Sequence, residues 1–281
     1  MRLAPGFLPI ALLAATSLVL LAAQAPPDAG VKSPPDAPRA EPGERLLVFS
    51  KTAGFRHDSI PDGIRCLREI LGDRYAIDAT EDAGAFTSTN LARYRAVVFL
   101  STTGDVLDPM QQRAFEEFIR AGGGFAGVHA AADTEHSWPW YGKLVGAYFK
   151  THPDVQESVV RVEDLSHRST RMLPAEWRRR DEWYVYDRNP RGSVRVLANL
   201  DTSTIEGTHM GSDHPIAWYQ EFEGGRSWYT GGGHTKESFS EPLFRDHLEG
   251  GILWAAGAPE QPVPKDSSRR DDALPEVRTS P

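Results

Sequence analysis

Three histidines in this sequence each lie shortly after an apolar run that is typical of a buried strand. They are His57, His129 and His234. The clearest case is His129, which follows the apolar run 125–128 and precedes three alanines and the carboxylate of Asp133. Ligands of open α/β sheets bind at the carboxyl ends of the strands, so an imidazole in this place is positioned for chemistry. The plainer alternative is that each histidine only bonds loop backbone.

Two kinds of chemistry suit these side chains. Neutral imidazoles together with the carboxylate of Asp133 or Glu182 are donors that zinc and other borderline divalent ions accept. The same imidazoles are a general acid and base near neutral pH without any metal. The spacing of His57, His129 and His234 matches no contiguous metal motif, so both interpretations stay open. The expected cofactor is a divalent metal such as zinc, and no nucleotide cofactor is expected.

The segment Asp181-Glu-Trp-Tyr combines two carboxylates with two aromatic rings. Aromatic faces pack on the apolar faces of sugars, so a sugar-contacting wall is one interpretation. The candidates for that wall are Trp183, Tyr184, Trp138 and Trp218. Tryptophan at the last two positions is more often part of the core. Of the two carboxylates, Glu182 is only slightly favoured over Asp181 as the functional group.

The remaining reactive or charged side chains carry weaker expectations. His152, His209 and His214 lie in predicted loops with no clear place at a strand end, and His136, His167 and His247 are expected at the surface. The basic triplet 178–180 predicts a solvated turn, because acidic residues follow it at once. Cys66, the single cysteine, falls in a predicted helix, where a small buried side chain is favoured over a nucleophile.

The elements that must position these residues alternate between strand and helix in the first half of the chain. Apolar runs at 46–50, 75–80, 96–101 and 125–128 predict strands. Helices are predicted after Ser59 and after Asp108, each with a proline in its first turn. This alternation favours an α/β fold with a doubly wound, mostly parallel sheet, because parallel neighbours need crossover connections.

The second half of the chain departs from that pattern. Residues 164–192 are polar and predict an irregular inserted region, apart from the aromatic run at 181–186. Residues 215–222 and 226–230 predict an antiparallel hairpin, because Glu223-Gly-Gly lies between them. A closing helix is predicted from Pro242 to about Ala256.

The two ends of the chain do not look like folded domain. Arg2, an apolar run and a small-residue cleavage pattern indicate a signal peptide at 1–25, so we expect export to the periplasm or the outside and no membrane span after cleavage. Residues 26–44 are a proline-rich linker and 258–281 a disordered tail, which leaves one domain at 45–257. Without Arg2 the chain has 30 basic and 39 acidic residues, a net charge of −9, which makes nucleic acid an improbable partner.

Six segments in order resemble the ThuA-like (trehalose-utilisation) family. They are Gly54-Phe-Arg-His57, Gly122-Gly-Gly-Phe-Ala-Gly-Val-His-Ala-Ala-Ala-Asp133, His152-Pro153, Asp181-Glu-Trp-Tyr184, His214-Pro-Ile-Ala-Trp218 and Gly225-Arg-Ser-Trp-Tyr-Thr-Gly-Gly-Gly-His234. The resemblance implies a class I glutamine amidotransferase-like fold with a flavodoxin-like sheet. It also implies a link to disaccharide metabolism through 3-keto sugars.

One departure from the amidotransferase pattern decides against that activity. Those enzymes carry a cysteine in the nucleophile elbow, and this chain has His129 there, with Cys66 on another element. Thioester chemistry on glutamine is therefore not expected. The favoured hypothesis is an exported enzyme that isomerises, eliminates or hydrolyses an oxidised (3-keto) disaccharide or glycoside by acid–base chemistry, with or without the assistance of a metal. The alternative is a non-catalytic carbohydrate-binding module, and the sequence does not specify the oligomeric state.

Overall fold

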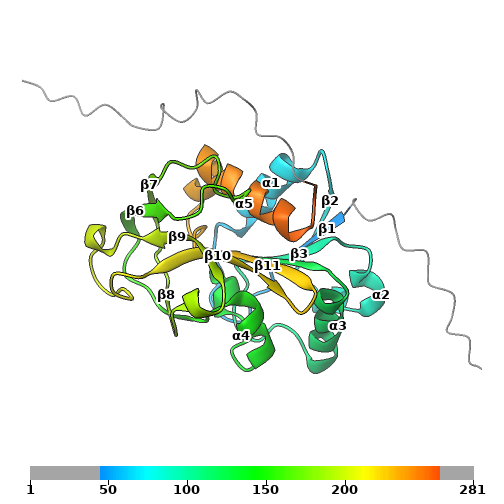
Figure 1. Cartoon of the computed structure of the whole chain (residues 1–281). Helices are drawn as coiled ribbons and strands as arrows, with labels where there is room; N and C mark the ends of the chain where they lie inside the picture. The colour runs from blue at the N-terminus through cyan, green and yellow to red at the C-terminus, as the bar shows by residue number, and fades with distance from the viewer. Residues whose placement is uncertain (1–44, 260–281) are drawn as a thin grey trace, which may run out of the picture. The chain divides into compact units, whose positions relative to one another are not determined.

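The computed structural model describes residues 45–259, which form an α/β domain around a nine-stranded sheet (Figure 1). The strands are β1 (Arg45–Phe49), β2 (Ala76–Thr80), β3 (Ala96–Leu100), β4 (Gly124–Val128), β5 (Phe149–Thr151), β6 (Gln156–Val162), β7 (Glu176–Asp181), β8 (Val185–Tyr186), β9 (Arg195–Leu200), β10 (Pro215–Phe222) and β11 (Gly225–Thr230). The helices are α1 (Ile60–Leu71), α2 (Ser88–Leu91), α3 (Pro109–Arg120), α4 (Pro139–Val145) and α5 (Pro242–Ala255). Short 3₁₀ turns are η1 (Ala83–Ala85), η2 (His129–Asp133), η3 (Pro190–Gly192), η4 (Thr202–Thr204) and η5 (Glu237–Ser240).

Several predictions concern residues outside the described range. These are the signal peptide at 1–25, the linker at 26–44 and all but the first two residues of the tail at 258–281. Among residues 45–259, no helix combines the length and the apolar character needed to cross a membrane.

Strand direction decides which side chains share an edge of the sheet. The order is β2-β1-β3-β4-β11-β10-β9-β6-β7, and β5 pairs with β8 in a separate small sheet. The first five strands of this order run parallel. From β10 onward each strand is antiparallel to the one before it. Because direction alternates there, β7 ends at the same edge as β1, β4 and β11.

The central strands need cover on both faces. β3 and β4 are buried along their whole length, as expected for parallel strands between two helical layers. Figure 1 shows α1 and α5 on one face of the sheet and α2, α3 and α4 on the other. The predicted mostly parallel sheet with a late hairpin is confirmed.

Local signals explain where the long helices begin and end. Asp108 and Gln111 form a capping box at the start of α3, which begins where the sequence predicts a helix. Gly122, with φ of 94°, supplies the left-handed residue that follows the helix before β4 starts. Cys66 lies buried in α1, and burial raises the pKa of its thiol to about 11, which agrees with its expected role as a small core residue.

The prediction of a solvated basic turn at 178–180 is wrong. These residues belong to β7, where Trp177, Arg179 and Asp181 are buried and alternate with exposed neighbours. Buried arginine is tolerated here because Arg179 bonds Asp181 at 2.8 Å and Glu241 at 2.9 Å. The polar composition of this stretch conceals an alternating strand.

Two histidines expected at the surface are also buried. His167 packs against Tyr219 with ring centroids 4.4 Å apart, and its Nδ1 lies 2.9 Å from the Ser169 hydroxyl. His247, inside α5, bonds the carbonyl of Ser169 at 2.9 Å. Both imidazoles fill the core around one loop, so the surface prediction is wrong for them and holds for the exposed His136.

Candidate metal centre

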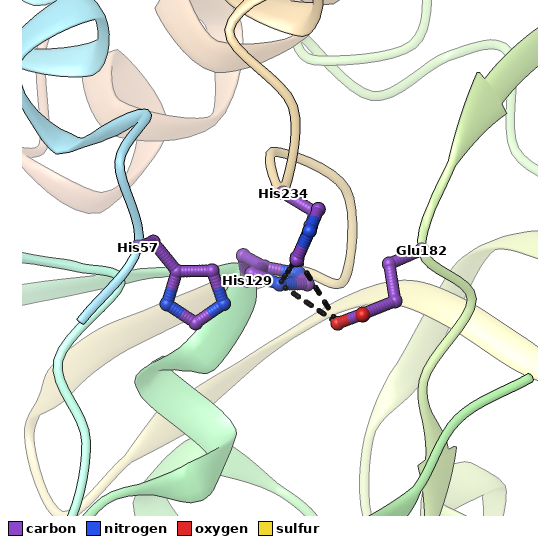
Figure 2. A group of neighbouring side chains, drawn as sticks. All are labelled: His57, His129, Glu182 and His234. Atoms are coloured by element: carbon purple, nitrogen blue, oxygen red, sulfur yellow. Dashed lines mark hydrogen bonds and ion pairs between the residues drawn. The ribbon is translucent and has the colours of Figure 1, made fainter. Parts of the chain in front are cut away.

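Four side chains converge at the carboxyl edge of the sheet, and one nitrogen or oxygen of each lies within 4.8 Å of the others (Figure 2). This cluster, called the His/Glu cluster below, consists of His57, His129, Glu182 and His234. The ring centroids of the three histidines are 4.8 Å, 5.1 Å and 5.2 Å apart. The three histidines therefore share one site at the strand ends. His234 reaches it because β11 runs parallel to β4.

His129 stands at the centre of the His/Glu cluster in an unusual backbone conformation. Its φ is 52°, which turns the chain sharply from β4 into η2 and places the buried imidazole above the strand end. Nδ1 donates a hydrogen bond to the carbonyl of Gly231 at 2.9 Å. A carbonyl only accepts, so in the neutral ring the lone pair is on Nε2. That atom lies 3.2 Å from Nδ1 of His234 and 3.4 Å from Oε2 of Glu182.

Glu182 and His234 form a close pair, with Oε2 and Nδ1 3.1 Å apart. Burial alone would raise the pKa of the Glu182 carboxyl, but the adjacent side chains of His129 and His234 hold that pKa well below the usual range. The bond to Glu182 raises the pKa of His234. The pair thus keeps a carboxylate next to an imidazole that holds its proton more firmly than a free histidine.

His57 is the neutral member of the His/Glu cluster. Burial, followed by the nearby charges of His129 and His234, lowers its pKa to about 3. Its Nδ1 is buried and has no hydrogen-bond partner among the described residues.

The donor set fits a borderline divalent cation. With bonds of about 2.0–2.1 Å to nitrogen and oxygen, the ligand atoms of tetrahedral zinc are about 3.3 Å apart. The three spacings among His129, Glu182 and His234 are 3.1, 3.2 and 3.4 Å. His57 supplies a fourth donor within 4.8 Å of the others. The His/Glu cluster has the atoms and the spacing to hold such an ion.

Asp181 holds the backbone segment that carries His234 of the His/Glu cluster. Its buried carboxylate accepts hydrogen bonds from the backbone N–H groups of Gly233 at 2.8 Å and His234 at 3.0 Å. Burial would raise the pKa of Asp181, but the Arg179 guanidinium, the nearby His129 and the backbone N–H groups of Gly233 and Glu182 keep that pKa low. Position 232 favours glycine, because a Cβ there would lie 2.6 Å from Nη1 of the buried Arg179. One charged residue of β7 thereby fixes the loop that carries His234.

The sequence interpretation missed His152. Its Nδ1 lies 3.1 Å from Oε1 of Glu182, the oxygen that does not face the other three members of the His/Glu cluster. The same Nδ1 lies 2.9 Å from the carbonyl of Pro153. The centroid of the Tyr184 ring lies 4.3 Å from that of His129 and 6.3 Å from that of His152. The only sequence signal for His152 was its presence in one of the six resembling segments.

Replacing His152 by alanine is expected to weaken zinc binding about 10–100-fold, the usual cost of removing a group that orients a metal ligand. Without His152 the Glu182 carboxylate is free to rotate away from His129 and His234. Competition with a chromogenic chelator measures the affinity. His136→Ala is the matched control, because that exposed imidazole bonds Asp133 outside the His/Glu cluster. An unchanged affinity in His152→Ala would show that Glu182 needs no such support.

The structure places the other predicted site residues elsewhere. Asp133 pairs with His136 at 2.9 Å and is not among the four clustered donors. All four predicted sugar-contacting aromatics are buried in the core, Tyr184 together with the three tryptophans, Trp183, Trp138 and Trp218. Their indole N–H groups donate to Gln156, Glu116 and Val145, respectively. Their faces are therefore packed against protein, and only Tyr184 contacts a member of the His/Glu cluster.

Comparisons with known proteins agree with this fold. A family model described as ThuA, trehalose utilisation, matches residues 45–255. A ThuA-like protein from Bacteroides uniformis is 23% identical with a TM-score of 0.63, over 79% of this chain and 94% of that one. One from Parabacteroides merdae is 23% identical with a TM-score of 0.65, over 80% and 94%. A β-galactosidase from a Rahnella species is 13% identical with a TM-score of 0.51, over 83% and 33%. No curated protein matches, and likenesses at these identities show the fold alone.

Proposed function

Because the chain belongs to the ThuA (trehalose utilisation) family, we propose that it is an exported enzyme acting on an oxidised, 3-keto disaccharide or glycoside. The observation that carries the proposal is the buried cluster of three histidines and one glutamate at the strand ends. The family connects the chain with carbohydrate, and the cluster supplies groups suited to acid–base chemistry. The pattern at 1–25 supports export.

A ketone at C3 of a sugar makes the hydrogen on C2 acidic. A base removes this proton, the electron pair forms a C1=C2 double bond, and the C1–O bond breaks. The departing oxygen takes up a proton, and later addition of water to the double bond completes a net hydrolysis. Return of the proton to the enolate instead gives isomerisation. Each route needs one group that accepts a proton and one that donates it.

The His/Glu cluster provides both groups in a confined space. His57 is an unprotonated imidazole and is the proton acceptor we propose, a weaker base than a free histidine because burial lowers its pKa to about 3. The Glu182–His234 pair holds a proton beside the substrate and can donate it. In the alternative arrangement, a divalent ion such as zinc held by the four donors would polarise the ketone oxygen and so stabilise the enolate, and the four residues would then act as ligands and not as acid or base. Burial of His129 and His57 limits the access of water to the reacting atoms.

Incubation with 3-keto-trehalose and 3-keto-glucosides in D₂O tests the proposal. The expected result is deuterium at C2 together with loss of the glycosidic bond or isomerisation, both followed by NMR. We expect a chelator to suppress the reaction and added zinc to restore it. Activity that survives chelation would assign the chemistry to the imidazoles alone. The proposal would be overturned if no keto sugar showed deuterium uptake or turnover. Sugar binding without turnover would favour a carbohydrate-binding module.

A further inference from the structure

We infer that Phe55 is a substrate-positioning residue whose exposed ring supports the apolar face of the sugar beside the His/Glu cluster. The inference rests on the proposed function, since it names the group that orients the same substrate. No residue suggested from the sequence fills this role, because Tyr184 is buried like Trp183, Trp138 and Trp218 and offers no exposed face. Phe55 is the aromatic side chain that the structure leaves free to do so.

The exposure of Phe55 is exceptional for this domain. Its side chain is 66% exposed, and it is the one aromatic among the three large apolar residues exposed in the range 45–259. The other two are Met110 and Leu165. An isolated exposed apolar residue needs no explanation by itself. An exposed aromatic face next to buried reactive groups is a place for a ligand with one flat apolar side.

The backbone of Phe55 is fixed, so the ring is presented from a defined position. The Thr103 hydroxyl donates to the carbonyl of Phe55 at 2.9 Å and accepts from the N–H of Gly54 at 3.2 Å. The N–H of Ala53 donates to the carbonyl of Thr103 at 2.7 Å. A rigid presentation lowers the entropy lost when a ligand settles on the ring.

The ring also lies in the correct place. It meets the His57 ring edge-on at 4.9 Å between centroids and 84° between planes. His57 in turn lies 4.8 Å from His129. Figure 2 shows His57 and Glu182 on opposite sides of the His/Glu cluster, so Phe55 borders it on the His57 side. A pyranose resting on this ring has its carbons next to the clustered donor atoms.

The surroundings of Phe55 favour a sugar over an apolar protein surface. Its neighbours in sequence are charged: Arg56 pairs with Glu81 at 2.7 Å, and Asp58 pairs with Lys236 at 2.9 Å. A single aromatic ring set among solvated charges does not form the continuous apolar patch of a protein interface. A sugar matches it, because C–H groups cover its faces and hydroxyl groups cover its rim.

The test compares Phe55→Ala, Phe55→Leu and Phe55→Trp in the keto-sugar assay. Loss of the ring removes contact made equally in the ground and transition states, so KM should rise about tenfold or more while kcat changes little. Leucine should fail to rescue, because it is apolar without a flat face, and tryptophan should restore KM. Zinc affinity should stay unchanged in all three variants. Leu165→Ala is the control, since Leu165 follows β6, which runs opposite to β7 and ends at the far edge.

Saturation-transfer NMR with the same keto sugars separates this inference from the proposed function. Turnover with an unchanged KM in Phe55→Ala would refute the inference and leave the function intact. Sugar binding by the native protein without turnover, lost in Phe55→Ala, would support the inference and refute the function. Leucine performing as well as phenylalanine would also refute the inference, because a general apolar contact would then suffice. A native protein that neither binds nor converts any of the sugars would overturn both.

Discussion

Replacing His129 by asparagine is expected to lower zinc affinity by more than about 100-fold, beyond the usual cost of losing an outer-shell partner, and to remove keto-sugar turnover. His129 is the donor in contact with both His234 and Glu182. Asparagine is the matched substitution, because its short polar side chain tolerates the left-handed backbone found here at φ of 52°. The variant therefore removes the imidazole without adding backbone strain.

Two measurements check this expectation. Calorimetric titration of the metal-free protein with zinc gives the affinity, and thermal unfolding without metal shows that the fold persists. His136→Asn is the control, since His136 is an exposed imidazole outside the His/Glu cluster. Native-like zinc affinity in His129→Asn would remove His129 from the ligand set. A large loss of stability in the metal-free variant would instead identify it as mainly a core residue.

The convergence of the three histidines was predictable because it depends on topology alone. Parallel strands present their carboxyl ends at one edge whatever the packing details, so a histidine after β1, after β4 and after β11 must arrive at that edge. The uncertain case was His234, which follows a hairpin. Its place was decided by pairing between β11 and β4, a long-range contact that periodicity does not report.

The position of Glu182 was harder to predict, because it depends on a strand that the sequence conceals. The sequence of β7 suggests a basic turn because three arginines follow one another. In the structure Arg178 and Arg180 are exposed, and Arg179 between them is buried. Arg179 belongs in the interior only when Asp181 and Glu241 are brought to it by the fold. Single-sequence patterns treat charge as exposed, so a buried ion pair defeats them.

The predicted sugar-contacting aromatics were wrong, and His152 was missed, for a related reason. A tryptophan near a carboxylate in the sequence is compatible with both a sugar site and a core position. The hydrogen bonds of the indole N–H groups distinguish the two, as when Trp218 donates to the carbonyl of Val145, and these partners are known only from the structure. His152 follows β5, an edge of the two-stranded sheet with β8, and not a strand of the main sheet. The strand-end rule therefore did not reach it.

Replacing Asp181 by asparagine is expected to lower the free energy of unfolding by about 3–5 kcal/mol, the usual cost of breaking a buried ion pair by removing one partner. The change leaves the buried Arg179 with only Glu241 as a carboxylate partner. It also weakens the anchor of the Gly233 and His234 backbone, so zinc affinity should fall as well. Denaturant unfolding of the metal-free protein measures the first effect. Asp133→Asn, at a half-buried carboxylate that pairs with the exposed His136, should stay within about 0.5 kcal/mol of the native protein.

The pH dependence of this difference identifies its electrostatic origin. The pKa of Asp181 is lower in the folded protein than in the unfolded chain, where it is about 3.9. Its ionised form therefore contributes stability that is complete above the unfolded pKa and is lost as the pH falls through the folded pKa. The gap between the native protein and Asp181→Asn should be constant from about pH 5 to 7 and should narrow below about pH 4. A gap that keeps its size at pH 3 would mean that Asp181 stabilises the domain by packing and neutral hydrogen bonds and not by its charge.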